Sequence, residues 1–404
     1  MPVGLTEPVQ LFPVDGIKLS ACSAGIYKKK RLDLALLSIT EGSTCAAVFT
    51  RNRFSAAPVE VARLHLNQNQ PSHCIINAGN ANAGTGAKGY KDALNVCQAV
   101  SRIAGCDSNS VLPFSTGVIG EFLPVDKICE KIPELISGLN RDNWLKVAKT
   151  IMTTDTVAKG VSKQITINKQ KITVTGIAKG AGMIRPDMAT MLAFIATDLL
   201  VESRDLSLLL SEAMAQSFNR INVDGDTSTN DACVLIATGK RKCDFNNYPE
   251  ERLLFEKTVT EVCTELAQAI IRDAEGATKF ITVQIRQGFD TDECLKVAYA
   301  IANSPLIKTA FYASDPNWGR ILAAIGRAGI SDLDIAKVSV FIDDVCIVQN
   351  GMRSADYSEQ AGQRVMQHDE ILLKVCLGRG DTEETIWTCD MSHEYVRINA
   401  EYRT

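Results

Sequence analysis

Up to residue 286, short apolar runs alternate with polar turns, and runs of this length predict buried β-strands. Residues 164–177 differ, because apolar and polar positions alternate there with a period of two about a short turn, which is typical of a β-hairpin. The other predicted strands are two in 33–50, joined at Glu41-Gly42, and one each at 74–77, 111–120, 191–196, 233–238 and 281–286.

Between the strands, apolar residues recur at the three- and four-residue spacing of an amphipathic helix. Strands that alternate with helices favour an α/β architecture, here layered sheets with helices outside. We assign residues 1–285 to this main domain. The predicted helices are 90–103, 125–138, 141–151, 204–218 and 249–272.

The rest of the chain, residues 286–404, predicts a smaller α+β domain that opens with a helix at 291–302. Residues 304–329 are interpreted as a strand, a turn at Asp315-Pro316-Asn317 and a helix. Short strands complete this domain, and we expect them at 338–350, 370–377, 384–389 and 394–399.

Composition narrows the class of protein. With 46% hydrophobic and 22% charged residues and a net charge of −4, the chain is typical of a soluble globular protein and lacks the basic excess of a nucleic-acid binder. No apolar run reaches the length of a membrane helix, and no secretory signal is visible. Thirteen scattered cysteines without a C-x-x-C motif fit a reducing, cytoplasmic compartment, and the four histidines show no metal-binding spacing.

Two glycine-containing motifs resemble ligand-binding loops, but the residues around them do not match the patterns that such loops require. Gly84–Gly89 matches G-x-G-x-x-G, yet residues 77–83 separate it from the preceding strand, whereas a dinucleotide site needs these glycines at the strand end. Asp224–Asp226 resembles the start of a calcium loop, but its sixth position is Thr229 and its twelfth is Leu235. We therefore predict neither a nucleotide site nor a metal site.

The stretch 178–197, A-K-G-A-G-M-I-R-P-D-M-A-T-M-L-A-F-I-A-T, places a hydroxyl residue, Thr190, at the opening of a buried strand and after a glycine-rich loop. Such a Thr can attack the carbonyl of the residue before it, here Ala189, and become a new N-terminus. Its α-amine, with an ordinary pKa of about 7.7–8.0, then serves as the base for its own hydroxyl. From the residues alone, however, most Thr residues at the start of an apolar strand are there for their β-propensity.

The segment K-G-A-G-M-I-x-P-x-M-A-T-M-L-A-F resembles the self-cleavage site of the ornithine acetyltransferase family, the glutamate N-acetyltransferases of arginine biosynthesis. Further similarity lies in N-A-G-N-A-N-A-G-T-G, F-N-R-I-N-V-D-G-D-T-S-T-N-D and the segment 304–329, and it extends from about residue 15 to the C-terminus. Gly84 stands where the family commonly has Cys, and Asn222 is a further departure.

The resemblance implies a fold superficially like that of the Ntn hydrolases and a cut between Ala189 and Thr190. The resulting chains, 1–189 and 190–404, would stay together as a tetramer of two α and two β chains. It also implies that an acetyl group passes from N2-acetylornithine through Thr190 to glutamate, with no cofactor and with acetyl-CoA as an optional second donor. The implied oxyanion hole is Thr116 with Gly117, and the implied substrate-binding residues are Thr153 or its neighbour Thr154, Lys179, Thr190, Glu275, Asn399 and Thr404.

Two departures lie beside the implied cut, since Asp187 replaces a frequent Asn and Arg185 a frequent small residue. Both leave the nucleophile in place but bear on cleavage rate or substrate preference. Two other functions stay open: an N-terminal-nucleophile aminopeptidase or amidase, in which water accepts the acyl group, and an unprocessed ligand-binding protein without catalysis.

Overall fold

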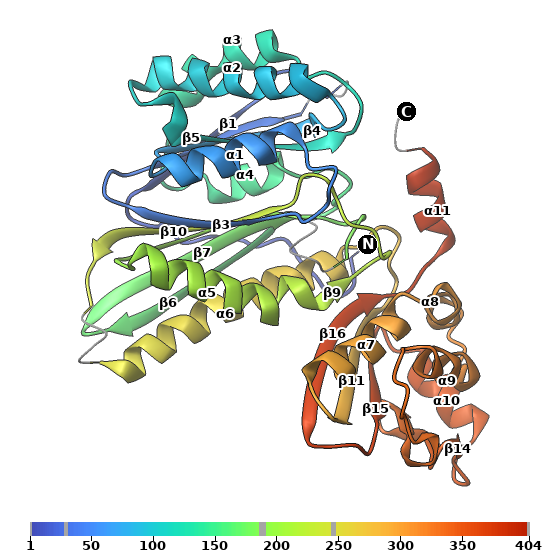
Figure 1. Cartoon of the computed structure of the whole chain (residues 1–404). Helices are drawn as coiled ribbons and strands as arrows, with labels where there is room; N and C mark the ends of the chain where they lie inside the picture. Colours follow the sequence, from blue (N-terminus) through green and yellow to red (C-terminus); the bar gives the residue numbers. More distant parts are fainter. Residues whose placement is uncertain (1, 28–30, 186–190, 244–247, 402–404) are drawn as a thin grey trace.

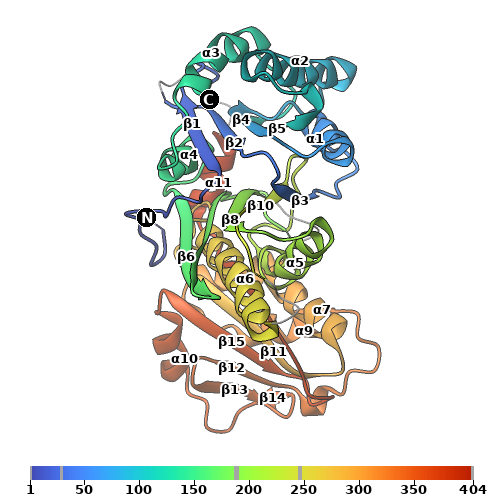
Figure 2. The ribbon, with the colours of Figure 1, turned by 90° about the vertical axis from the view of Figure 1, so that its left-hand side faces the viewer.

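The computed structural model describes residues 2–27, 31–185, 191–243 and 248–401 of the 404-residue chain. Within these residues the strands form three sheets (Figures 1 and 2). Sheets A and B pack face to face in the larger part of the molecule, and sheet C lies in the smaller part at the bottom of Figure 1. This arrangement confirms the predicted class of layered α/β sheets and helices.

Sheet A has the strand order β1-β2-β4-β5. Its first two pairs are antiparallel and the last pair, β4 with β5, is parallel. The carboxyl ends of β4 and β5 therefore meet at the same edge of the sheet. The strands are β1 (Ile17–Cys22), β2 (Leu34–Ile39), β4 (His73–Asn80) and β5 (Val111–Val118).

Sheet B has the order β3-β10-β8-β7-β6. Strand β8 lies parallel to β10 and antiparallel to β7, and β6 with β7 forms the predicted hairpin. The two strands predicted in 33–50 are present but belong to different sheets. The strands of sheet B are β3 (Thr44–Phe49), β6 (Lys159–Ile167), β7 (Gln170–Lys179), β8 (Leu192–Leu199) and β10 (Ala232–Arg241).

Four layers result, because each sheet buries both faces. The inner faces of sheets A and B meet in a common core, in which the rings of Phe114 and Phe194 lie edge to face at 5.0 Å. Helices α2 and α3 cover the outer face of sheet A, α5 and α6 cover that of sheet B, and α1 and α4 flank the shared core. These helices are α1 (Ala57–Gln68), α2 (Gly86–Ala104), α3 (Val125–Ser137), α4 (Trp144–Thr150), α5 (Ser203–Gln216) and α6 (Pro249–Arg272).

Sheet C, of order β14-β13-β12-β15-β11-β16-β9, packs against helices α7 to α10 around a separate core. The predicted boundary at residue 285 falls within β11, and the domain division stays a prediction. The elements are β9 (Ile221–Asn222), β11 (Phe280–Gly288), α7 (Thr291–Ala302), α8 (Pro305–Tyr312), α9 (Trp318–Gly326), β12 (Ser339–Ile342), β13 (Val345–Gln349), β14 (Met352–Arg353), α10 (Glu359–Met366), β15 (Glu370–Cys376), β16 (Thr382–Cys389) and α11 (His393–Ala400).

Two predicted strands of the C-terminal part are wrong, because both segments are helices. The first strand assigned within 304–329 is α8, in which Pro305 occupies the first turn and Ile307, Ala310 and Phe311 bury one helical face. The strand expected at 394–399 is α11, a helix with no buried residue, so its apolar positions carried no information about packing. Its N-terminus is capped by Ser392, whose hydroxyl accepts the N–H of Glu394 at 3.1 Å.

Candidate active site

A pocket of about 250 Å³ lies where the ends of the two packed sheets meet α11. Strands β5 and β7 end at this pocket, and β8 and β10 begin beside it. Its wall therefore combines segments that are far apart in the sequence. Six of the residues implied by the resemblance line it together: Thr116, Gly117, Thr153, Lys179, Glu275 and Asn399.

Gly117 lies at the end of β5 in a conformation that glycine adopts more readily than other residues. Its φ is +133°, and a Cβ atom there would lie 2.6 Å from the backbone N of Asn80 on β4 and would also collide with the backbone of Gly79. Only a residue without a side chain lets the two parallel strands approach this closely. The geometry fits a backbone amide exposed to a bound ligand, and its function as an oxyanion donor stays a prediction.

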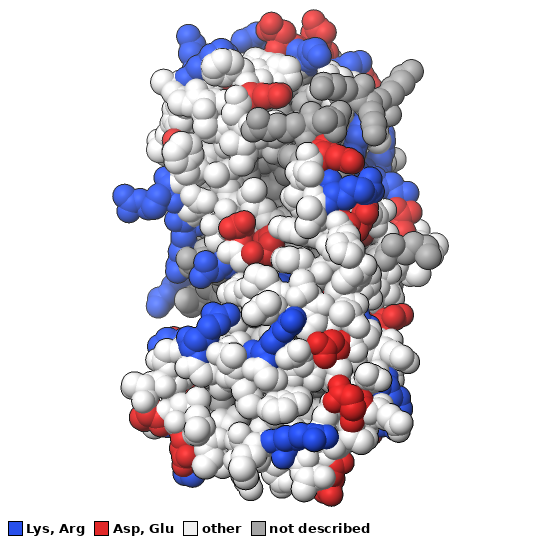
Figure 3. Space-filling model, turned by 90° about the vertical axis from the view of Figure 1, so that its right-hand side faces the viewer, with Lys and Arg blue, Asp and Glu red and all other residues white. Residues whose placement is uncertain are grey.

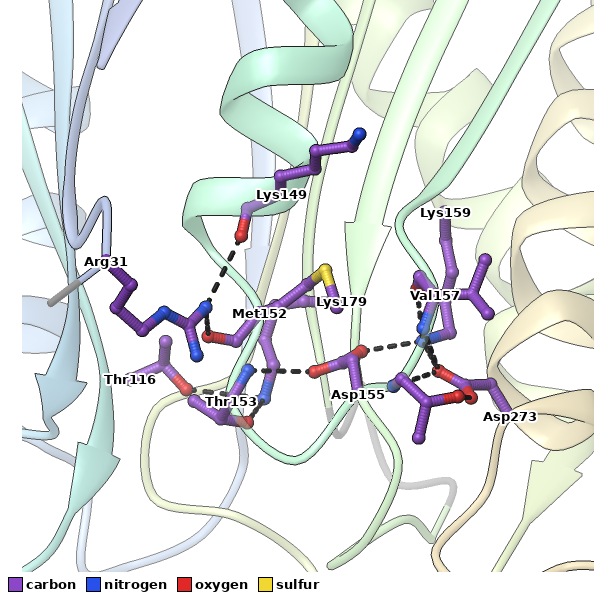
Figure 4. A network of polar contacts seen from close by, with 12 residues as sticks. Arg31, Thr116, Lys149, Met152, Thr153, Asp155, Val157, Lys159, Lys179 and Asp273 are labelled. Atoms are coloured by element: carbon purple, nitrogen blue, oxygen red, sulfur yellow. Dashed lines mark hydrogen bonds and ion pairs between the residues drawn. The ribbon is translucent and has the colours of Figure 1, made fainter. Parts of the chain in front are cut away.

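Lys179 places its ammonium group between two hydroxyls (Figure 4). Nζ donates to Thr153 Oγ1 at 2.8 Å and lies 3.4 Å from Thr116 Oγ1, to which it also donates. Burial lowers the pKa of Lys179, and the carboxylates of Asp155 and, further off, Glu275 oppose this shift. Both Thr153 and Thr154 line the pocket, but the contact with Lys179 is made by Thr153.

Glu275 and Asn399 also line the pocket and contact each other. Asn399 Nδ2 donates to Glu275 Oε2 at 2.8 Å, and the backbone N–H of Glu275 donates to the carbonyl of Ala181 at 2.8 Å. Helix α11 reaches this position because the hydroxyl of Ser392 donates to the carbonyl of Gly276 at 2.6 Å. The lining of the pocket thus includes a cation and a carboxylate that is paired with an amide.

The sequence interpretation missed a buried acid in the pocket wall. Asp231, which directly precedes β10, is 2% exposed, and its Oδ2 has no hydrogen-bond partner among the described residues. Burial raises the pKa of Asp231 well above its ordinary value, although the Ser228 hydroxyl and the charge of Lys179 act against this. Buried carboxylates without full pairing cluster at functional sites. Its position in a polar loop made it indistinguishable from a turn residue.

Asp224 was also missed, and it orients the segment that leads toward the implied cut. Its carboxylate accepts the N–H groups of Met183 at 2.7 Å and Ile184 at 2.9 Å, and the hydroxyl of Tyr395 at 3.1 Å. Burial raises the pKa of Asp224, and these hydrogen bonds oppose the rise. Met183 has a φ of +57°, so this carboxylate fixes an unusual backbone.

Three of the implied residues, Ala189, Thr190 and Thr404, lie outside the described residues, as does Asp187. Met191, which directly follows Thr190 in the chain, lines the pocket and is 3% exposed. The pocket therefore begins one residue from the predicted nucleophile.

The asparagine-rich segment before α2 holds neighbouring loops together. Asn80 Nδ2 donates to the carbonyls of Glu121 at 3.2 Å and Phe122 at 3.1 Å, and Asn82 Nδ2 donates to that of Gly89 at 2.9 Å. Helix α2 starts at Gly86, four residues before the predicted start. These contacts account for the segment by local structure.

The described part of the chain contains no cluster of three or more His, Cys, Asp or Glu side chains placed to hold a metal ion. No described helix is both long and apolar enough to cross a membrane. On the face shown in Figure 3, side chains of both charges are interspersed with uncharged surface. This pocket, with Lys179, Asp231 and Glu275 in its lining, is the candidate binding site for a small molecule.

The model of the ArgJ family matches residues 18–404, so the chain belongs to the ArgJ family. It is 53% identical over 408 residues to the arginine biosynthesis bifunctional protein ArgJ of Pseudomonas syringae pv. tomato and 52% identical over 406 residues to that of Pseudomonas fluorescens, with all of each chain covered. A solved chain of the arginine biosynthesis bifunctional protein argJ from Bacillus halodurans is 33% identical, with a TM-score of 0.47 over 51% of this chain and 97% of that chain.

Proposed function

We propose that this protein transfers the acetyl group of N2-acetylornithine to glutamate, and that an ester on Thr190 carries the group between the two substrates. The observation that carries the proposal is the pocket, which brings two hydroxyls, a backbone glycine, a cation and an acid–amide pair beside Met191. Full-length relatives named for arginine biosynthesis support the substrate class.

The first step needs a nucleophile and its base on one residue. After the chain is cut between Ala189 and Thr190, the α-amine of Thr190 takes the hydroxyl proton while Oγ1 attacks the acetyl carbonyl. The amide C–N bond then breaks, the proton passes to the leaving amine, and ornithine departs. In the second step the amine of glutamate attacks the ester, its proton passes to the α-amine and from there to Oγ1, and the C–O bond to Thr190 breaks.

The negative oxygen of each tetrahedral intermediate needs hydrogen-bond donors that are already in place. Thr116 and the N–H of Gly117 supply them. Because the ammonium of Lys179 donates to Thr116 Oγ1 at 3.4 Å, the hydroxyl hydrogen of Thr116 is free to point to the substrate.

Charge complementarity orients the amino-acid substrates. Lys179 meets the α-carboxylate as a point charge, with Thr153 beside it, and Glu275 with Asn399 meets an amino group. The C-terminal Thr404 completes the pocket in this proposal. The substrates are polar and small, which fits a pocket of about 250 Å³.

The proposed mature protein consists of chains 1–189 and 190–404, paired into a tetramer of two α and two β chains in the cytoplasm. Acetyl-CoA is included as a second donor because the relatives are named bifunctional. The mechanism uses no cofactor.

An acetyl-transfer assay with purified protein tests the proposal. Ornithine release beyond one equivalent per Thr190 should require glutamate and yield N-acetylglutamate in equal amount, and acetyl-CoA is tested as an alternative donor. Continued ornithine release over many turnovers without glutamate would support the amidase instead. No release under any condition, with ornithine still bound, would support a ligand-binding protein.

A further inference from the structure

A line of buried charged side chains runs from the pocket into the interior (Figure 4). Lys159 Nζ on β6 lies 2.7 Å from Asp155 Oδ1 and 2.6 Å from Asp273 Oδ2, and all three side chains are at most 1% exposed. Removing three charges from water is costly, and a buried ion pair is weak evidence for stability. The arrangement therefore calls for a second explanation.

Asp273, at the end of α6, binds the chain just before β6. Its Oδ2 accepts the N–H groups of Thr156 at 2.9 Å and Val157 at 3.3 Å, and its Oδ1 accepts the hydroxyl of Thr156. These contacts anchor the start of β6 to α6. None of them reaches the pocket.

Asp155, in contrast, makes its backbone contacts beside the pocket. Its Oδ2 accepts the N–H of Thr153 at 3.0 Å, and its Oδ1 accepts the N–H of Gly180 at 2.7 Å. The hydroxyl of Thr153 accepts a hydrogen bond from the Lys179 ammonium, and Gly180 directly follows Lys179 in the chain. One carboxylate thus holds the backbone on both sides of the Thr153–Lys179 contact.

We propose that Asp155 is a positioning residue, which fixes Lys179 and Thr153 relative to each other and keeps the Lys179 ammonium charged for the carboxylate of the substrate. This inference rests on the proposed function, in which Lys179 binds that carboxylate. Lys159 contacts Asp155 from the interior, and Asp273 contacts Lys159 on its other side.

The electrostatic environment of Asp155 and Lys179 supports this assignment. Burial acts to raise the pKa of Asp155, but Lys159, Lys179 and the N–H of Gly180 outweigh it and hold that pKa well below its usual range. These contacts favour the charged form of Asp155 beside Lys179. The groups that act on the pKa of Lys179 besides burial are Asp155, Asp231 and Glu275, which raise it, and Lys159, which lowers it.

The test is a set of pH profiles of kcat/KM for N2-acetylornithine, measured on Asp155→Asn, Lys159→Met and the matched control Asp273→Asn. At high pH, kcat/KM should fall as Lys179 loses its proton, and we call this fall the alkaline limb of the profile. Asp155→Asn removes a negative charge and should move this limb down by about one pH unit. Lys159→Met removes a positive charge and should move it up. Asp273→Asn should leave it in place.

A comparison of kcat/KM with the melting temperature separates a positioning role from a role in folding. Asp155→Asn should lower kcat/KM by about 10²-fold, whereas Asp273→Asn should lower the melting temperature with kcat/KM nearly unchanged. Equal effects of Asp155→Asn and Asp273→Asn on both the limb and kcat/KM would overturn the inference. If Asp155→Asn does not fold, Asp155→Glu replaces it, because this variant keeps the charge and moves the carboxylate; wild-type kcat/KM in Asp155→Glu would overturn the positioning role.

Wild-type controls distinguish this failure from failure of the proposed function. Each variant is checked for chain cleavage by intact mass, and rates are normalised to the cleaved fraction. A wild-type protein without glutamate-dependent transfer contradicts the proposed function and, with it, the basis of this inference. A wild-type protein that transfers acetyl while the variants show no shifts contradicts only the positioning by Asp155.

Discussion

Replacing Gly117 by alanine tests the oxyanion hole with a control that the same region provides. Gly117→Ala introduces a methyl group 2.6 Å from the backbone N of Asn80 at a residue whose φ is +133°. Gly120→Ala introduces the same group at a φ of +89°, but nothing lies within 4 Å of it. The two variants share a strained backbone and differ in the collision with β4.

The magnitudes follow from these two terms. A non-glycine residue at an unfavourable φ costs on the order of 1–3 kcal/mol at either position. At Gly117 the backbone of β4 or β5 must also move, which displaces the predicted donor. Loss of one oxyanion donor costs about 10²–10³ in kcat. We therefore expect kcat to fall by about 10²-fold or more in Gly117→Ala and to stay within a few-fold in Gly120→Ala.

The assay is steady-state acetyl transfer from N2-acetylornithine to glutamate, with thermal unfolding of both variants. Gly117→Ala should melt at a lower temperature than Gly120→Ala because of the added collision, and a selective loss of kcat in folded Gly117→Ala would support the oxyanion role. If both variants lose the same small amount of activity, or if Gly117→Ala changes KM alone, the reasoning about this donor is refuted.

Two further predictions concern the acids of the pocket. Glu275→Gln removes the charge opposite Lys179 but keeps a partner for Asn399, so KM for N2-acetylornithine should rise by about tenfold with little change in kcat, and unchanged KM would count against its substrate contact. The raised pKa of Asp231 means that folding favours its protonated form, so wild-type stability declines as pH rises above about 4 toward the folded-state pKa. Asp231→Asn cannot ionise, and its melting temperature relative to wild type should therefore increase from pH 5 to pH 8; a constant difference would show that this carboxyl does not titrate in that range.

Much of the fold could be predicted because buried strands and amphipathic helices leave strong local patterns. The predicted helix 249–272 coincides with α6, and the run 191–196 lies in β8 but for its first residue. Helix α11 was predicted as a strand because it has no buried residue and therefore no informative apolar pattern. It is held by its N-terminal cap and by tertiary contacts. Local pattern cannot report such contacts.

The candidate site was reached by resemblance rather than by pattern, and physical chemistry explains why. Lys179 and Glu275 face one pocket only after two sheets have packed and α11 has docked. Asp155 and Asp231 lie in polar loops, where acids usually serve turns, and nothing in their neighbours signals burial. Part of their environment arises from Lys179, which lies more than 20 positions away in the sequence and whose charge acts on both carboxyl groups.

The central claim is that an internal threonine becomes the first residue of a catalytic chain. Intact mass under denaturing conditions, with N-terminal sequencing, tests it directly on the active protein and on Thr190→Ala. The account predicts two chains, of which the second starts with Thr190-Met191-Leu192, and one uncut, inactive chain for the variant. A fully active wild-type protein that remains a single chain of 404 residues, or a second chain that starts elsewhere, would contradict it.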